Sequence, residues 1–159
     1  MNYRKIDKSE IKFLKEMLYE ALFVPEGQSP FSLSILEKPE ISVYIDNWGK
    51  LPNDLAIVAE INNELVGAIW GRSFYPPKLG YGFIDSETPE ISMAIKKSFR
   101  NRGVGTMLID ELSRRYAEKG IKAISLSVDK LNKAKSLYKR SGFKVITDKG
   151  SDLIMKKKL

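Results

Sequence analysis

The segment RNRGVGTMLIDEL, residues 100–112, places two glycines between arginines and a run with helical spacing. Glycine is unfavourable inside a helix, so Gly103 and Gly105 indicate a helix entry that something approaches closely. The first N–H groups of a helix have no backbone acceptor, and the helix dipole adds partial positive charge there. Arg100 and Arg102 could add charge-assisted hydrogen bonds. The spacing predicts a phosphate-binding turn, with an ordinary loop-to-helix junction as the alternative.

Two common phosphate-binding motifs do not fit this segment. A P-loop requires G-x-x-x-x-G-K-[ST], and the chain contains no such run. A dinucleotide-binding fingerprint requires a third small residue three positions after the second glycine, where this chain has Leu108. The spacing by itself therefore leaves the identity of the phosphate ligand open.

The composition excludes several kinds of catalysis. The chain has no Cys and no His, which excludes a Cys nucleophile, a disulfide, a Cys-ligated metal and the commonest general base. No compact acidic motif suggests a metal site, and we predict none. A general base must then be a carboxylate, a tyrosine or a water held by one of them. The net charge of +7 favours anionic partners: phosphate-bearing cofactors, acidic peptides or nucleic acid.

Length and composition suit one soluble domain over residues 1–159, with 43% hydrophobic and 30% charged residues. No apolar run reaches the roughly 18 residues that a membrane span needs. Residues 1–6 do not begin a signal peptide. We therefore expect a cytoplasmic protein with no membrane partner, which could form a homodimer.

Hydrophobic periodicity predicts the elements that must hold the glycine turn. Strands are expected over residues 1–6, 55–61, 64–71, 90–97, 122–128, 143–147 and 152–157. Helices are expected over residues 8–23, 39–49, 104–120 and 131–141. Asp7 and Glu10 have the spacing of a capping box, and Asn62-Asn63 predicts a tight hairpin turn. Residues 72–89 form an irregular loop that is rich in aromatics. This order predicts an α/β (α+β) fold.

Two segments resemble the GNAT superfamily of N-acetyltransferases. Arg100, Gly103 and Gly105 match its motif [RQ]-x-x-G-x-[GA], between a strand that ends Met93-Ala94-Ile95 and a long helix. The run NKAKSLYKRSGF, residues 132–143, matches N-x-[AG]-x-x-L-Y-x-x-x-G-F. Its matching positions are Asn132, Ala134, Leu137, Tyr138, Gly142 and Phe143. The strong resemblance covers residues 90–157, and the earlier half agrees in element order only.

The resemblance implies a GNAT fold and acetyl-CoA as the co-substrate. The fold would be a central mixed, mostly antiparallel sheet of about six to seven strands with helices on both faces. The cofactor would lie between two splayed central strands, with its pantetheine arm beside residues 90–97 like an added strand. The implied cofactor-binding residues are Met93, Ala94, Ile95, Lys97, Arg100, Asn101, Arg102, Gly103, Val104, Gly105, Thr106, Asn132 and Tyr138.

The resemblance also implies catalytic residues. Tyr138 matches the family tyrosine whose phenol can protonate the departing thiolate, and the alternative is a core aromatic on an amphipathic helix. Glu90 begins the cofactor strand, where the family often has an acidic residue, so it is a candidate general base. Glu87 and Asp85 are nearby alternatives, and each carboxylate could instead be solvated. Asn132 could cap a helix while it contacts the cofactor.

The acceptor is predicted only as a primary amine of a small molecule or of a peptide or protein. Tyr75, Tyr81 and Phe83 of the irregular loop could wall its pocket, whereas Trp48 reads as core. The positive surplus argues mildly against polyamines and strongly cationic drugs. A non-catalytic acyl-CoA-binding sensor is an alternative, against which Tyr138 weighs. We do not expect nucleic-acid binding, because the basic residues are dispersed and no recognition motif accompanies them.

Overall fold

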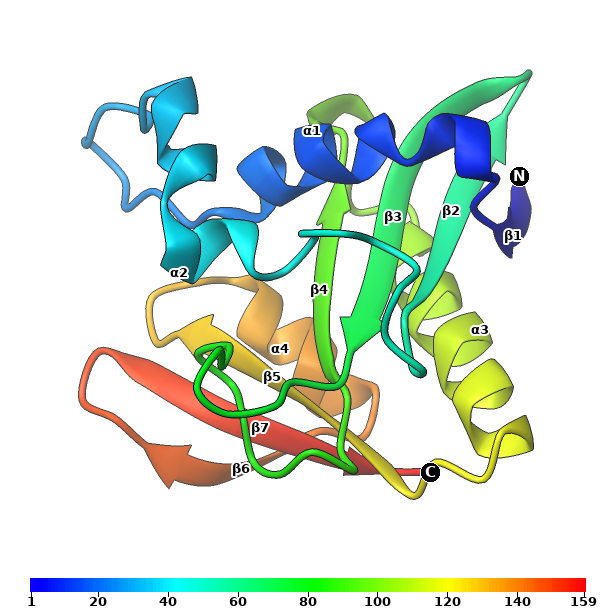
Figure 1. The fold of residues 1–159 in the computed structure, drawn as a ribbon. Helices are drawn as coiled ribbons and strands as arrows, with labels where there is room; N and C mark the ends of the chain where they lie inside the picture. Colours follow the sequence, from blue (N-terminus) through cyan, green and yellow to red (C-terminus); the bar gives the residue numbers. More distant parts are fainter.

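In the computed structural model, which describes residues 1–159, the chain folds around a seven-stranded sheet of order β1-β2-β3-β4-β5-β7-β6 (Figure 1). The strands are β1 (Asn2–Lys5), β2 (Leu55–Ile61), β3 (Glu64–Arg72), β4 (Glu90–Ile95), β5 (Ala123–Asp129), β6 (Lys144–Asp148) and β7 (Asp152–Lys158). The α-helices are α1 (Lys12–Ala21), α2 (Pro39–Ser42), α3 (Val104–Glu118) and α4 (Ala134–Arg140). Short 3₁₀ turns cover Lys8–Glu10, Leu33–Glu37 and Lys97–Phe99.

Neighbouring strands are antiparallel except β4 and β5, which run parallel. These two strands pair at one position, Glu90 opposite Ser125, and then diverge (Figure 1). Beyond that position β5 continues along β7 up to Asp129. The sheet is therefore open between the later halves of β4 and β5, and the predicted mixed, mostly antiparallel fold is confirmed.

Each face of the sheet carries its own hydrophobic core. Helix α3 buries Leu108 and Tyr116 against one face. Helix α1 buries Leu14 and Met17 against the other, together with the residues around α2. Figure 1 shows α1 and α2 in front of the sheet and α3 and α4 behind it. A ligand that enters the opening between β4 and β5 thus has a different helix pair on each side.

The helix predicted over residues 39–49 is much shorter in the structure. α2 ends at Ser42, and turns follow up to Gly49. Asn47 and Gly49 have φ values of 51° and 92°, which a right-handed helix does not allow. The spacing of Tyr44 and Trp48 resembles that of a helical face, but these residues lie in consecutive turns. The 3₁₀ turn Leu33–Glu37 was not predicted, and the strand predicted to reach residue 97 ends at Ile95.

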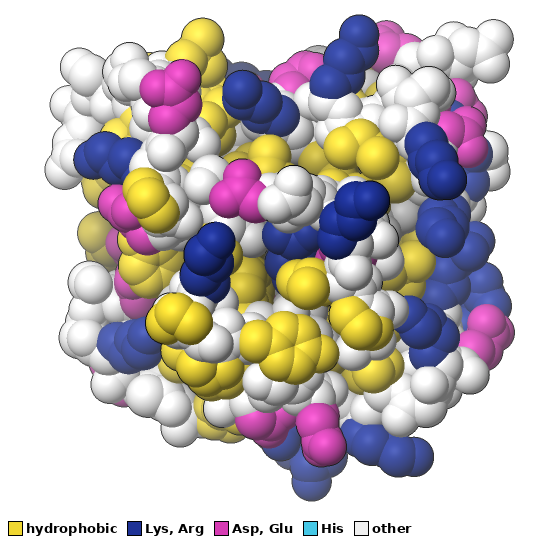
Figure 2. Space-filling view, in the orientation of Figure 1, with side chains coloured by type: hydrophobic (Ala, Val, Ile, Leu, Met, Phe, Trp, Pro, Cys, Tyr) yellow, Lys and Arg dark blue, Asp and Glu magenta, His cyan; other side chains and the backbone are white.

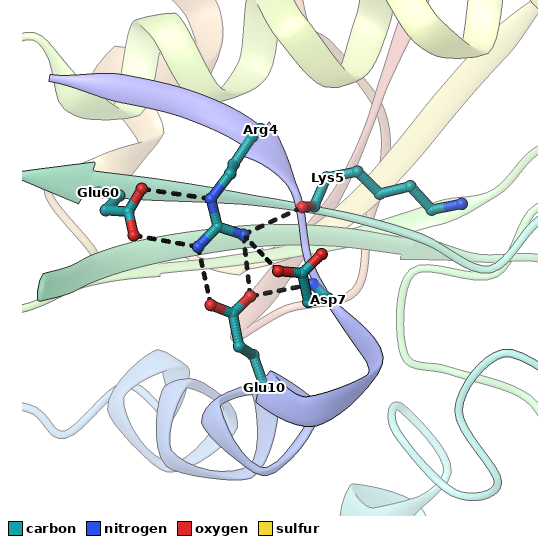
Figure 3. Close-up of polar contacts among 5 residues, drawn as sticks. All are labelled: Arg4, Lys5, Asp7, Glu10 and Glu60. Atoms are coloured by element: carbon teal, nitrogen blue, oxygen red, sulfur yellow. Dashed lines mark hydrogen bonds and ion pairs between the residues drawn. The ribbon is translucent and has the colours of Figure 1, made fainter. Parts of the chain in front are cut away.

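Arg4 ties together three segments of the N-terminal half (Figure 3). Its guanidinium donates to Glu60 of β2 at 3.2 and 3.1 Å and to Glu10 at 2.9 and 2.7 Å. Glu10 also accepts the Asp7 N–H at 2.9 Å, which is the capping contact expected from their spacing. The hydrogen bonds from Arg4 lower the pKa of Glu10 to about 2 and also lower that of Glu60.

We expect Arg4→Ala to lower the free energy of unfolding by about 1 kcal/mol near neutral pH, because bidentate contacts to two carboxylates are lost. The folded pKa of Glu10 is depressed, so its contribution is complete above the unfolded value of 4.5 and disappears as the pH falls through about 2. The difference from the native chain should therefore shrink in acid. Urea unfolding of the native chain and the variant, at neutral pH and in acid, measures this difference in the free energy of unfolding.

Arg114→Ala is the control for this comparison. Arg114 pairs with Glu111 and Glu118 one turn away on α3, and its side chain is 53% exposed. Exposed pairs of this kind contribute little to stability because water and salt screen them. Equal losses for the two variants at neutral pH would contradict a special role for Arg4.

Candidate active site

The turn before α3 presents backbone N–H groups that have no acceptor. Gly103 caps the helix with φ 81°, and Asn101 before it also has a positive φ of 60°. The first helical bond runs from the Met107 N–H to the Gly103 carbonyl at 3.2 Å. The N–H groups from Val104 to Thr106 are therefore free at the positive end of the helix dipole. This geometry suits an anion such as a phosphate.

The two motif glycines are needed for different reasons. A Cβ at Gly103 would meet no atom within 4 Å, so its left-handed backbone alone favours glycine, and its surface is open. A Cβ at Gly105 would lie 2.8 Å from Leu137 Cδ2 and 3.4 Å from Ile95 Cδ1. Gly105 lets α3 pack closely on α4 and β4. Of the two glycines predicted to clear space for a ligand, only Gly103 faces open space.

Both motif arginines are exposed and only weakly held. Arg100 Nε donates to the Ile95 carbonyl at 2.8 Å, and its guanidinium lies 3.5 Å from Glu20 of α1. Arg102 lies over the ring of Phe99, with 5.6 Å between guanidinium and ring centroid. Exposed pairs of this type contribute about 0–1 kcal/mol, so either side chain can turn toward a phosphate at small cost.

The backbone of β4 offers polar groups to the opening between β4 and β5. The Lys96 N–H donates to the Val66 carbonyl of β3 at 2.8 Å. Because the backbone groups of successive strand residues point to opposite edges, those of Met93 and Ile95 face away from β3. They face the part of the opening beyond Glu90, where β5 has diverged. An extended ligand with amide groups could pair there as an added strand.

Two further residues predicted on this strand have other contacts. Ala94 pairs with Ala68 of β3, and its side chain packs in the core beneath α1. Lys97 begins a 3₁₀ turn, where its carbonyl accepts the Arg100 N–H at 3.3 Å. The alternation of the strand thus favours Met93 and Ile95 as ligand contacts and argues against the backbone of Ala94.

Tyr138 of α4 packs against the core on the α3 side of the sheet. Its ring meets Phe143 edge-on, with centroids 5.8 Å apart and an interplanar angle of 70°. Burial, without any hydrogen-bonding contribution, raises the pKa of Tyr138 to about 12. The phenol therefore stays protonated at neutral pH. Asn132 Oδ1 accepts the N–H of Ala134, the first residue of α4, at 2.9 Å, although Lys133 is the residue directly before the helix.

Glu90 is buried, with only 3% of its surface exposed. Its Oε2 accepts the Tyr44 hydroxyl at 2.5 Å, and its Oε1 accepts the Gly82 N–H at 3.0 Å. Burial raises the pKa of Glu90 to about 7 in spite of these bonds. The alternative of a solvated carboxylate is wrong for Glu90. Direct proton transfer from a substrate amine is not possible in this conformation either, because both oxygens are covered.

Glu90 instead supports the segment of residues 80–82. A Cβ at Gly80 would lie 2.2 Å from Glu90 Oε1. A Cβ at Gly82 would lie 2.6 Å from the backbone carbon of Leu126 in β5. Only glycine allows the segment to lie this close to the carboxylate and to the strand. The two glycines around Tyr81 were the sequence signal for this close approach.

Tyr81 is fixed by residues that sequence reasoning did not connect with the site. Its N–H donates to the Tyr44 hydroxyl at 2.8 Å, and its carbonyl accepts the Lys149 ammonium at 2.9 Å. These partners lie 37 and 68 positions away in the chain. Tyr81 thereby becomes a rigid wall residue, although its own side chain is 47% exposed.

The remaining candidate carboxylates lie on a surface turn. Glu87 and Asp85 are exposed, and Asp85 Oδ1 accepts the Glu87 N–H at 2.9 Å. This is the solvated arrangement that the sequence left open for them. Neither side chain makes a further contact that would point to a catalytic role.

A cavity of about 400 Å³ lies between the segment that joins α1 to α2 and the adjacent ends of β5 and β7. Its lining residues are Leu22, Phe23, Phe31, Ile35, Lys38, Glu40, Ile41, Tyr81, Asp129 and Asp152. Of the three aromatics predicted to wall a pocket, only Tyr81 lines it. Phe83 packs against the core beneath α1, and Tyr75 is exposed on a separate turn. Trp48 lies under the guanidinium of Arg72 at 5.1 Å.

The chemistry at this site is that of backbone donors, a phenol and carboxyl groups. No cluster of Asp or Glu side chains is arranged to hold a metal ion. None of the helices combines the length and the apolar character that a membrane crossing requires.

The chain matches the model of the acetyltransferase (GNAT) family over residues 14–143. A ribosomal-protein-alanine N-acetyltransferase from Brucella melitensis has the same fold, with a TM-score of 0.71, 19% identity and 100% of both chains covered. The PaiA N-acetyltransferase from Thermoplasma acidophilum, solved with coenzyme A, has a TM-score of 0.69 and 24% identity over 99% of this chain and 98% of its own.

An aminoglycoside 6'-N-acetyltransferase, also solved with coenzyme A, has a TM-score of 0.66 and 19% identity over 99% of this chain and 97% of its own. No curated protein sequence matches the chain. At these identities the structural neighbours show a shared fold.

Proposed function

The chain belongs to the acetyltransferase (GNAT) family, and we propose that it transfers an acetyl group from acetyl-CoA to a primary amine. The observation that carries this proposal is the opening between β4 and β5 beside the free N–H groups of α3. Coenzyme A has amide groups on its pantetheine arm and a pyrophosphate. The outward backbone groups of Met93 and Ile95 suit the amides, and the first turn of α3 suits the pyrophosphate.

Acetyl-CoA would supply a thioester carbonyl, and the side chains around the opening would handle the protons. A C–N bond forms and a C–S bond breaks, so the amine must lose a proton and the sulfur must gain one. We assign the second task to Tyr138, whose pKa of about 12 keeps a proton available. We assign Glu90 to positioning, because it holds Tyr44 and the segment of residues 80–82. The amine proton would pass to cavity water.

The acceptor amine belongs to a small molecule or to a peptide or protein in this proposal. A titration with acetyl-CoA, followed by thiol release with a panel of amines, tests it. Binding with no thiol release from any amine would favour the non-catalytic acyl-CoA-binding sensor instead. A cytoplasmic location and a homodimer stay predictions.

We expect Gly103→Ala to weaken acetyl-CoA binding about tenfold, because the added methyl would stand at the open surface where N–H groups face the phosphate. Gly120→Ala is the matched control at the other end of α3. Gly120 has φ 84°, and a Cβ there would likewise meet no atom within 4 Å. Both variants carry the same left-handed strain of about 1 kcal/mol.

Calorimetric titration with acetyl-CoA separates the two variants. Gly120→Ala should bind like the native chain and lose only stability. Native affinity in a folded Gly103→Ala chain would remove the phosphate site from the first turn of α3.

A further inference from the structure

The cavity between the α1–α2 segment and the ends of β5 and β7 is lined by two chemically different kinds of side chain. The apolar ones are Leu22, Phe23, Phe31, Ile35 and Ile41. The acidic ones are Glu40, Asp129 and Asp152, and Lys38 is the one cation of the lining. Three carboxylates against one ammonium give the lining a net charge of −2.

These carboxylates form no close ion pair in the folded chain. Glu40 and Asp152 take part in none of the salt bridges. The pKa of Tyr81 is raised mainly by burial and, to a smaller extent, by the negative charges of Glu40 and Asp152. Both carboxylates therefore lie near that phenol. Asp129 Oδ1 accepts the Leu131 N–H at 2.8 Å, and its other oxygen is free.

The position of the cavity relates it to the proposed reaction. Asp129 is the last residue of β5 and pairs with Asp152, the first residue of β7. Strand alternation puts Asp129 on the same face as Ser125, which is the face that α1 and α2 cover. Tyr138 lies on the α3 side, so the cavity and the proposed proton donor are on opposite sides of the sheet.

We propose that this cavity binds the acceptor, and that the acceptor is a primary amine with an apolar body and a second positive charge. The inference rests on the proposed function and names its substrate class. The apolar side chains of the lining would bury the body of the acceptor, and the carboxylates would bind its second charge.

A second charge is required because the carboxylates are poorly suited to the reacting amine itself. A carboxylate beside an ammonium favours the charged form and raises its pKa, which opposes attack. The carboxylates therefore suit a cation at the far end of the acceptor, while the reacting amine extends toward the opening.

This conclusion reverses the expectation that the net charge of +7 disfavours cationic acceptors. In Figure 2 the Lys and Arg side chains gather most densely along the right-hand edge, on the side of β1 and α3. The segment that joins α1 to α2 lies on the left. Salt screens exposed charges beyond about 10 Å at 0.1 M, so a bound acceptor responds to the nearby carboxylates and not to the total.

Three amines with the same six-carbon chain test the inference: 1,6-diaminohexane, hexylamine and 6-aminohexanoate. They end in a positive, an apolar and a negative group. We expect kcat/KM for thiol release to be about tenfold higher for the diamine than for hexylamine, from one charged hydrogen-bonded contact. A tenfold ratio exceeds the factor of two that the diamine gains simply because it carries two equivalent reacting amines. The value for 6-aminohexanoate should be the lowest.

Asp152→Asn and Glu40→Gln should each reduce the ratio of kcat/KM for the diamine to kcat/KM for hexylamine severalfold. Glu26→Gln is the control, because it removes the same charge from the α1–α2 segment at an exposed position outside the lining. Urea unfolding checks that all three variants are folded.

The outcomes distinguish the inference from the proposed function. Turnover that is fastest with 6-aminohexanoate, or a diamine preference that survives both variants, would overturn the inference and leave acetyl transfer standing. If no amine releases thiol, the proposed acetyl transfer is rejected. Calorimetric titration of the chain with the same three compounds then tests whether the cavity binds a cation. Tighter binding of the diamine that Asp152→Asn weakens supports the acidic site, and equal binding of all three overturns it.

Discussion

Tyr138→Phe is expected to slow acetyl transfer by up to about 10²-fold, with acetyl-CoA affinity unchanged. The substitution removes the hydroxyl and keeps the ring, so the edge-on contact with Phe143 is preserved. A thiolate leaves fairly well without help, which puts the effect at the low end for general acid catalysis. Because burial raises the pKa of Tyr138 to about 12, the phenol can donate across the neutral range and is lost as an acid only as the pH rises toward that value.

Thiol release with the best amine of the panel measures this effect, and slow hydrolysis of acetyl-CoA can replace it. Tyr116→Phe is the control because it also removes one phenol oxygen and keeps the ring. The Tyr116 hydroxyl donates to the Asn53 carbonyl at 2.7 Å, far from any proposed chemistry. That variant should lose about 1 kcal/mol of stability and keep its turnover. Native turnover in a folded Tyr138→Phe chain would leave Tyr138 as a core residue only.

Asp54→Ala is expected to lower the free energy of unfolding by about 3–5 kcal/mol, because it leaves the Arg72 guanidinium buried without a negative charge to balance it. Arg72 donates to the two oxygens of Asp54 at 2.8 and 2.9 Å, and the side chains are 4% and 1% exposed. Arg72 also donates to the Val43 carbonyl at 2.9 Å. The pair thus joins the end of β3 to the turns that follow α2.

The double variant Asp54→Ala/Arg72→Met separates a lost attraction from a stranded charge. Replacing both partners with apolar groups removes the uncompensated guanidinium, so part of the stability should return. Urea unfolding of both variants provides the comparison. A loss below about 1 kcal/mol for Asp54→Ala would mean that water reaches Arg72.

Local features of the chain were readable from the sequence because backbone rules act over a few residues. Asn62 and Asn63 form the predicted hairpin turn, with φ values of 50° and 63°. Gly103 and Gly120 bound α3 as predicted, since both have a left-handed backbone. The same short range applies to the turn before α3 and to the Asn132–Tyr138 segment, because the residues of each motif are neighbours in the chain.

Tertiary structure alone decided the state of Glu90. Its partner Tyr44 lies 46 positions away, in a segment that the sequence pattern assigned to a helix. Burial depends on which elements cover a side chain, and no local spacing records that. A residue predicted as an accessible base is therefore a buried carboxyl with a pKa of about 7.

The sequence by itself determined the family resemblance, the order of elements and the total charge. Only the folded chain decided where that charge acts. Glu40, Asp129 and Asp152 come from three separate parts of the sequence and meet at one cavity. The physical reason is that the field at a point is set by the charges within a few ångströms of it. Composition sums charges over the whole chain, whereas the fold selects the few that lie around a given cavity.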